Sequence, residues 1–163
     1  ALTVGTMDGA NVEIYEQVGA ENIFIFGMNV EEVNSLRAKG YNPRTAIDAN
    51  PYLKRALELI RNDFFSPSCR GVFQPLVDTM NYDYYMVAAD FASYAETQAA
   101  MARLYKDQTE WTRRCIHNIA NMGTFSSDRS IRDYAEKIWE LSPVPVTLPD
   151  SDDFPAEKKS KKQ

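Results

Sequence analysis

The chain has 163 residues, of which 44% are hydrophobic and 25% charged, and its formal net charge is −5 at pH 7. These values are typical of a soluble domain large enough for a hydrophobic core, and the negative charge argues against a nucleic-acid surface. No apolar run approaches the roughly 20 residues of a membrane span. Two cysteines, Cys69 and Cys115, are too few for a disulfide framework or a four-ligand zinc site, so a reduced, cytoplasmic setting is expected.

The first third of the sequence alternates strand and helix patterns. A short apolar run over 2–5 is followed by helical spacing over 10–18 and by a continuous apolar run over 22–27. The second run is typical of a strand buried on both faces. Asn29 and Glu32 then have the spacing of a capping box at a helix start. This β-α-β-α order predicts an α/β fold with a parallel sheet and right-handed crossovers.

The middle of the chain is expected to hold helices and a third strand. Asn50 followed by Pro51 predicts the start of a helix, and a shorter helix is predicted near Pro75. Residues 84–90 are mostly apolar and predict a strand. Asp90 is the expected N-cap of the long helix that follows.

Two more helices and a tail are predicted in the last third. Asp107, with Glu110 three residues later, predicts another capping box. The helix predicted over 127–141 carries a single apolar stripe, which must pack against another surface. The stripe consists of Ile131, Tyr134, Ala135, Ile138 and Trp139. Residues 142–163 contain four prolines and end in a lysine-rich run, so we expect one domain over 1–141 followed by a disordered tail.

Asp8 is the first candidate for a functional side chain. It follows the first predicted strand and precedes a helix, where doubly wound sheets bind ligands. The turn has only Gly5 and Gly9, not the spaced glycines of a dinucleotide fingerprint. The carboxylate of Asp8 can instead cap the helix that begins at Ala10, and spacing favours the cap over a ligand contact.

The other polar candidates are expected to be structural. His117 is the single histidine and has no carboxylate or nucleophile at catalytic spacing. Cys115 lies on a different helical face from His117, and Cys69 beside Arg70 has no neighbouring base. The arginines and acids between 110 and 136 interleave, which is typical of a solvated face with ion pairs. The residues by themselves therefore show no catalytic constellation and no metal site.

Several segments in order nevertheless resemble the α-glucan phosphorylases, the family of glycogen, starch and maltodextrin phosphorylases. They are "ALTVGTMDGANVEI", "ENIFIFG", "AKGYNP", "FFSP", "VAADFASY", "LYKDQTEWTR" and "NIANMGTFSSDRSIRDYAEKIW", and they extend from Ala1 to about Glu140. The resemblance implies a glycosyltransferase that cleaves α-1,4-glucan with phosphate to glucose 1-phosphate. It also implies pyridoxal 5′-phosphate as cofactor, and the Rossmann-like portion of the C-terminal domain of a glycosyltransferase B fold with a helical C-terminal part.

The same resemblance implies that the catalytic residues lie outside this chain. In the family, the lysine that forms a Schiff base with the cofactor precedes the segment matching "ALTVGT". The glycine-rich stretch that contacts sugar and phosphate also precedes it. We therefore expect a C-terminal portion that lacks the N-terminal domain, is inactive alone and binds no covalent cofactor, whereas the intact enzyme is a homodimer under allosteric control. Thr6, Asp8 and Asn11 would lie in the turn and helix behind the cofactor pocket.

Two alternatives accompany this interpretation. A Rossmann-like module of this kind can act without catalysis, in binding or assembly. A glycogen synthase shares the fold but uses a nucleotide sugar, and the opening segment resembles the phosphorylases specifically.

Overall fold

The computed structural model describes residues 2–147 and divides into two compact units, Ala1–Gly123 and Thr124–Gln163. The boundary lies inside the domain predicted over 1–141. In chain order the elements are β1 (Val4–Gly5), α1 (Ala10–Val18), the 3-10 turn η1 (Ala20–Asn22), β2 (Phe24–Ile25), α2 (Val30–Ala38), α3 (Pro43–Ala49), α4 (Pro51–Arg61), α5 (Gln74–Tyr82), α6 (Val87–Lys106), α7 (Gln108–Ala120), the 3-10 turn η2 (Met122–Phe125) and α8 (Ser127–Lys137).

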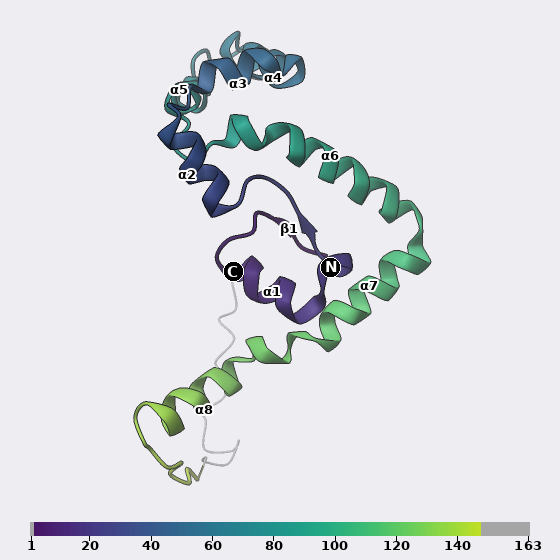
Figure 1. Ribbon diagram of the computed structural model, residues 1–163, viewed down its shortest axis with the longest axis vertical. Coiled ribbons are helices and arrows are strands. Elements are labelled where there is room, and N and C mark those ends of the chain that lie inside the picture. Colours follow the sequence, from purple (N-terminus) through teal and green to yellow (C-terminus); the bar gives the residue numbers. More distant parts are fainter. Residues whose placement is uncertain (1, 148–163) are drawn as a thin grey trace, which may run out of the picture. The chain divides into compact units, whose positions relative to one another are not determined.

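The sheet of the first unit is small and parallel. Val4 of β1 lies opposite Phe24 of β2, and α1 makes the crossover between the two strands (Figure 1). Both strands and the parallel pairing confirm the predicted order. Phe24 and Ile25 are half-buried, so the prediction of a strand buried on both faces is wrong. A two-stranded sheet, the only one among the described residues, has too little neighbouring structure to cover both faces.

The predicted third strand is wrong, because residues 83–86 form a turn and α6 begins at Val87. Asp90 lies in the first turn of α6 and is not its N-cap. The helix start is held instead by Asp83, whose side-chain oxygens accept hydrogen bonds from the backbone N–H groups of Val87 and Ala88, each at 2.8 Å. The strand was predicted wrongly because a short apolar run at a helix start has the same local sequence pattern as a buried strand.

Asp83 also ties the turn to the segment before α3. It is 3% exposed, and its carboxylate accepts a third hydrogen bond from the hydroxyl of Tyr41 at 2.6 Å. Burial of the ring, together with the neighbouring carboxylate, raises the pKa of the Tyr41 hydroxyl. A buried carboxylate is tolerated where such donors surround it. This single side chain therefore joins the α2–α3 connection to the start of α6.

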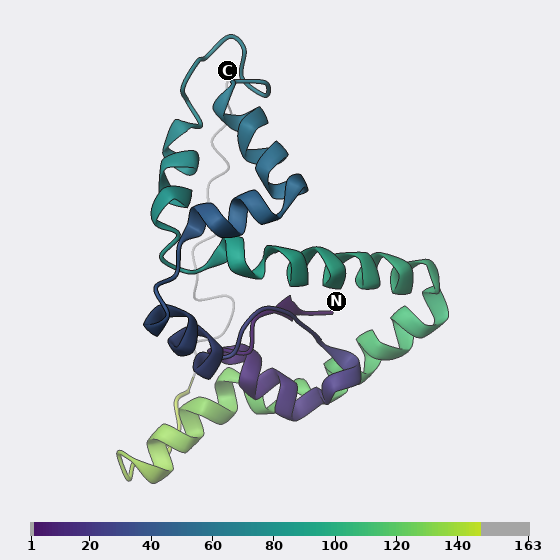
Figure 2. The same cartoon turned by 45° about the horizontal axis from the view of Figure 1, so that its top comes forward.

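A small apolar core lies among α3, α4, α5 and the start of α6, which Figures 1 and 2 both show as neighbours. Leu53, Leu57 and Ala88 are buried at its centre, with Ala46, Ile47, Met80 and Phe91 packed around them. The helix predicted from Asn50 and Pro51 is confirmed, with the Asn50 side chain capping it. Helix α3 was not predicted, although Asn42 and Pro43 begin it in the same way.

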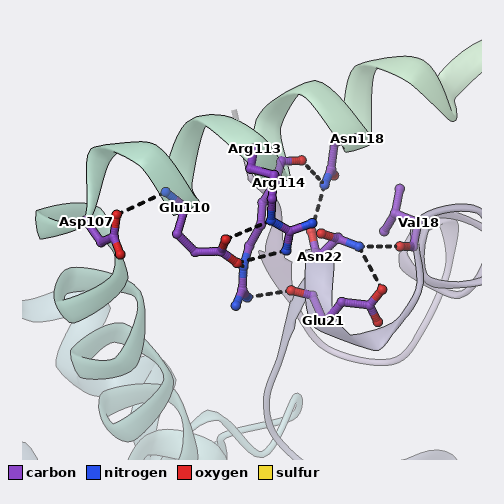
Figure 3. Close-up of polar contacts among 8 residues, drawn as sticks. All are labelled: Val18, Glu21, Asn22, Asp107, Glu110, Arg113, Arg114 and Asn118. Carbon is purple, nitrogen blue, oxygen red and sulfur yellow. Dashed lines mark hydrogen bonds and ion pairs between the residues drawn. The ribbon is translucent and has the colours of Figure 1, made fainter.

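Buried amides join α7 to the end of α1 and to η1 (Figure 3). The side chain of Asn118 donates to the backbone oxygen of Asn22 at 2.8 Å. The side chain of Asn22 in turn donates to the backbone oxygen of Val18, also at 2.8 Å. His117 lies 3.2 Å from the same Val18 oxygen through its Nε2 atom. His117 is therefore a hydrogen-bonded helix residue, as predicted.

The start of α7 carries the predicted cap but not the complete box. The side chain of Asp107 accepts from the backbone N–H of Glu110 at 3.0 Å. The Glu110 carboxylate turns instead to Arg113 and Arg114, with shortest distances of 2.7 Å to each (Figure 3). Hydrogen bonds from Arg113 and then Arg114 lower the pKa of Glu110 to about 2. Arg114 continues the network to the backbone oxygen of Glu21.

In the second unit, α8 ends at Lys137, four residues before the predicted end at Leu141. Glu140 has a left-handed backbone, with φ of 53°, which a regular α-helix does not contain. The large side chains of the predicted stripe, Ile131, Tyr134, Ile138 and Trp139, are 49–63% exposed. Residues 142–147 form neither helix nor strand, and the tail predicted from there on otherwise falls outside the described residues. No helix within 2–147 is long and apolar enough to cross a membrane.

The ion pairs of Glu110 give a pH-dependent prediction. The pKa of Glu110 falls from 4.5 to about 2 on folding, so its ion pairs stabilise the fold above pH 4.5 and are lost as the pH falls toward 2. Glu110→Gln should therefore unfold at lower urea concentration than wild type at pH 6, and the two should converge near pH 2. Glu16→Gln, at an exposed position on α1, is the control. If the difference in unfolding urea concentration between Glu110→Gln and wild type were the same at both pH values, the stabilising role of these ion pairs would be contradicted.

Candidate functional site

A cavity of about 480 Å³ lies at the carboxyl ends of the two parallel strands of the first unit. Its walls come from the turn after β1, the turn after β2, α2 and the first half of α6. The lining residues are Thr6, Asp8, Phe26, Met28, Val33, Tyr85, Val87, Asp90, Phe91 and Tyr94. In open α/β sheets, ligands bind at this edge. The sequence-predicted residues Thr6 and Asp8 are thus brought to one cavity.

The turn after β1 is closed by its own side chains. The hydroxyl of Thr6 donates to the carboxylate of Asp8 at 3.1 Å, and the side chain of Asn11 donates to the backbone oxygen of Thr6 at 2.9 Å. Asn11 does not line the cavity. Its amide lies against Gly5, where an added Cβ would be 2.3 Å from the Asn11 nitrogen. Asn11 therefore holds the strand end from behind, while Thr6 and Asp8 face the cavity.

The predicted cap by Asp8 is wrong. The N-cap of α1 is Gly9, with φ of 49°, and no side chain makes a capping hydrogen bond there. Glycine adopts this backbone conformation without a steric cost. As a result Asp8 lies one residue outside the cap, with its side chain on the hydroxyl of Thr6 and its backbone oxygen accepting from Asn11 at 3.1 Å.

The opposite wall is fixed by side chains of α6. The carboxylate of Asp90 accepts from the backbone N–H of Met28 at 2.9 Å, and the hydroxyl of Ser93 accepts from that of Gly27 at 3.0 Å. Gly27 has φ of +78°, and a Cβ there would lie 2.6 Å from the Asp90 carboxylate. Glycine is required by both the backbone conformation and the close approach. Sequence reasoning missed these contacts, because no local pattern marks a partner more than 60 residues away.

The cavity lining is mainly apolar, with four aromatic side chains and two carboxylates. Phe26 and Tyr94 meet edge to face, with ring centroids 5.2 Å apart. Burial raises the pKa of Asp90, and the charges of Asp83 and Glu32 raise it further, whereas the hydrogen bond from Met28 opposes the shift. An apolar pocket with a few oriented polar groups is the usual form of a small-molecule site.

The lining residues do not fit pyridoxal 5′-phosphate. They include no lysine to form a Schiff base and no arginine or histidine to balance a phosphate, and their two charged groups are carboxylates. His117, Cys69, Cys115 and the arginines of α7 and α8 lie outside the cavity. Both cysteines are free thiols, and within the described part of the chain no cluster of residues is suited to a metal ion.

The contact between Asp90 and Met28 can be tested by unfolding. Asp90→Ala leaves the half-buried N–H of Met28 without its acceptor, which typically costs about 1–3 kcal/mol. Asp90→Asn keeps an acceptor oxygen and should cost less. The control is Glu96→Ala, at an exposed position of the same helix. The free energy of unfolding is measured by urea titration, and equal losses for Asp90→Ala and Glu96→Ala would show that the contact does not stabilise the fold.

Comparison with known proteins gives consistent matches. The family model for carbohydrate phosphorylases matches residues 1–141. The chain is 48% identical over 151 residues to a glycogen phosphorylase of Synechocystis sp., covering 92% of this chain and 18% of that protein. It is 48% identical over 150 residues to the human brain form (91% and 18%) and 46% identical over 154 residues to the human muscle form (94% and 18%). The chain thus spans under a fifth of the length of these relatives. The resemblance inferred from sequence is confirmed: the chain belongs to the carbohydrate phosphorylase family.

Proposed function

We propose that this chain is the C-terminal portion of an α-glucan phosphorylase. The reaction transfers the terminal glucosyl unit of an α-1,4-glucan to phosphate. A phosphate oxygen bonds to the anomeric carbon, the glycosidic C–O bond breaks, and a proton passes to the leaving oxygen. The observation that carries the proposal is the family match over residues 1–141, with 46–48% identity to glycogen phosphorylases across more than nine-tenths of the chain.

The role proposed for the present residues is to support the site. Thr6, Asp8 and Asn11 would stand behind the cofactor pocket of the intact enzyme. Their mutual hydrogen bonds support this role, since they fix the turn at the carboxyl end of β1. Pyridoxal 5′-phosphate, when bound in the intact enzyme, would supply a phosphate group for proton transfer. Because the cavity lining lacks a lysine and any other cation, the groups that hold this cofactor would come from other parts of the protein.

The remaining family properties are part of the same proposal. The small parallel sheet and its crossover helix are compatible with the Rossmann-like portion of a glycosyltransferase B fold. As a phosphorylase, the intact enzyme would be cytoplasmic, homodimeric and under allosteric control. The competing function is a non-catalytic module for binding or assembly, which the absence of any cation in the cavity lining would also allow.

A segment exchange tests the proposal. Residues 1–141 of this chain replace the matching segment of the human brain glycogen phosphorylase, and release of glucose 1-phosphate from glycogen and phosphate is measured. We expect the hybrid to keep activity within about tenfold of the parent enzyme, which corresponds to about 1.4 kcal/mol in the barrier. The 163-residue chain alone, with added cofactor, should release none, since a catalytic site needs groups held on both sides of its cleft.

The two parts of this experiment have different controls. The parent enzyme, taken through the same purification, sets full activity, and cofactor absorbance reports whether the hybrid is assembled. An assembled hybrid that binds the cofactor but is inactive would contradict the proposed function and favour a non-catalytic module. Glucose 1-phosphate formed by the 163-residue chain alone would contradict the supporting role.

A further inference from the structure

Three tyrosines stand exposed around the turn between α5 and α6. Tyr82, Tyr84 and Tyr85 are 84%, 72% and 81% exposed, although Asp83 between them is 3% exposed. Large aromatic side chains gathered on a surface in this way usually mark a contact site for another molecule. The three tyrosines belong to four consecutive residues, so their spacing depends on the backbone of one turn.

That backbone is held firmly. Asp83 accepts three hydrogen bonds through its side chain, and its own backbone oxygen accepts from the N–H of Met86 at 2.9 Å. The guanidinium of Arg37 donates to the backbone oxygen of Tyr84 at 3.2 Å and lies 5.5 Å from the centroid of the Tyr84 ring. Tyr84 and Tyr85 meet edge to face at 5.0 Å. A fixed aromatic surface loses little conformational entropy when it binds a ligand.

A shallow hollow of about 300 Å³ lies within this surface. Tyr82 and Tyr84 contribute to its walls, together with Arg37, Tyr41, Gly40, Asp83 and Met86. The only carboxylate in this lining is that of Asp83, and its hydrogen bonds to Tyr41 and to the start of α6 already occupy it. The hollow therefore offers aromatic faces, tyrosine hydroxyls and the donors of one guanidinium, which has five N–H groups in all.

These groups match a neutral sugar chain. The C–H face of a pyranose ring can pack on an exposed tyrosine ring, while its hydroxyl oxygens accept from arginine and tyrosine donors. A neutral ligand also meets no repulsion from a protein with a net charge of −5, whereas a polyanion would. We propose that Tyr82, Tyr84 and Arg37 form a surface subsite for a short stretch of α-glucan. The choice of α-glucan among neutral glycans rests on the proposed function.

The test uses the 163-residue chain in native gels that contain soluble glycogen, with maltoheptaose titrations to measure affinity. We expect wild-type mobility to be retarded by glycogen, and Tyr84→Ala to weaken binding of maltoheptaose by at least about fivefold, through loss of the packed ring. Tyr84→Phe keeps the ring and should keep most of the binding. Tyr52→Ala is the matched control, because Tyr52 is 81% exposed on α4 and lies outside the hollow. Melting curves should be alike for all variants.

Three results would overturn the inference: no retardation of the wild type, the same loss for Tyr52→Ala as for Tyr84→Ala, or unchanged glucan binding in Tyr84→Ala. If that last result comes with a change in sedimentation mass, the tyrosines contact another protein chain instead. The outcome is independent of catalysis, since the chain alone is expected to be inactive. If the hybrid enzyme is active but this chain does not bind glucan, only the subsite is rejected. If the hybrid is assembled but inactive and this chain shows Tyr84-dependent binding, only the proposed function is rejected.

Discussion

Two hydrogen bonds from the backbone after β2 to side chains of α6 determine the shape of the cavity. The N–H of Met28 binds Asp90 at 2.9 Å and that of Gly27 binds Ser93 at 3.0 Å. Each strand of the sheet has only two residues, so the ladder alone gives the strand ends little support. Because α6 supplies the missing acceptors, the turn after β2 and the aromatic side chains of α6 are held together as two walls of one site.

The same kind of contact recurs throughout the first unit. Asp83 binds the first amides of α6. The side chain of Asn118 in α7 donates to the backbone oxygen of Asn22 in η1, and the side chain of Asn22 donates to the backbone oxygen of Val18 at the end of α1. Asp83, Asn22 and Asn118 are each at most 5% exposed. A buried polar group left without its partner costs more than the bond contributes when made. These contacts therefore specify how neighbouring elements of the first unit are joined.

Local signals in the sequence predicted the parts of the fold that depend on local chemistry. Asn29 and Asn50 cap their helices as expected, and the pairing of β1 with β2 follows from the strand–helix–strand order. The prediction of a third strand was wrong because its apolar residues begin a helix. The signal for that helix start is the side chain of Asp83, which accepts a hydrogen bond from the backbone N–H of Val87. At the cavity, Asp8 was a candidate from its place after a strand, although spacing favoured a helix cap, and Thr6 was named only through the family resemblance. The roles of Asp90 and Ser93 were not predicted, because their partners lie more than 60 residues away.

Residue-by-residue amide hydrogen exchange tests most directly whether α6 fixes the strand end. If it does, the amides of Gly27 and Met28 exchange within about tenfold of the rate at Leu57 in the core helix α4, since local protection follows the stability of the hydrogen bond. In Asp90→Ala the Met28 amide becomes much faster, while Leu57 is unchanged. Exchange of Gly27 and Met28 in the wild type at the rate of an unstructured peptide would show that the contact is absent and contradict the account.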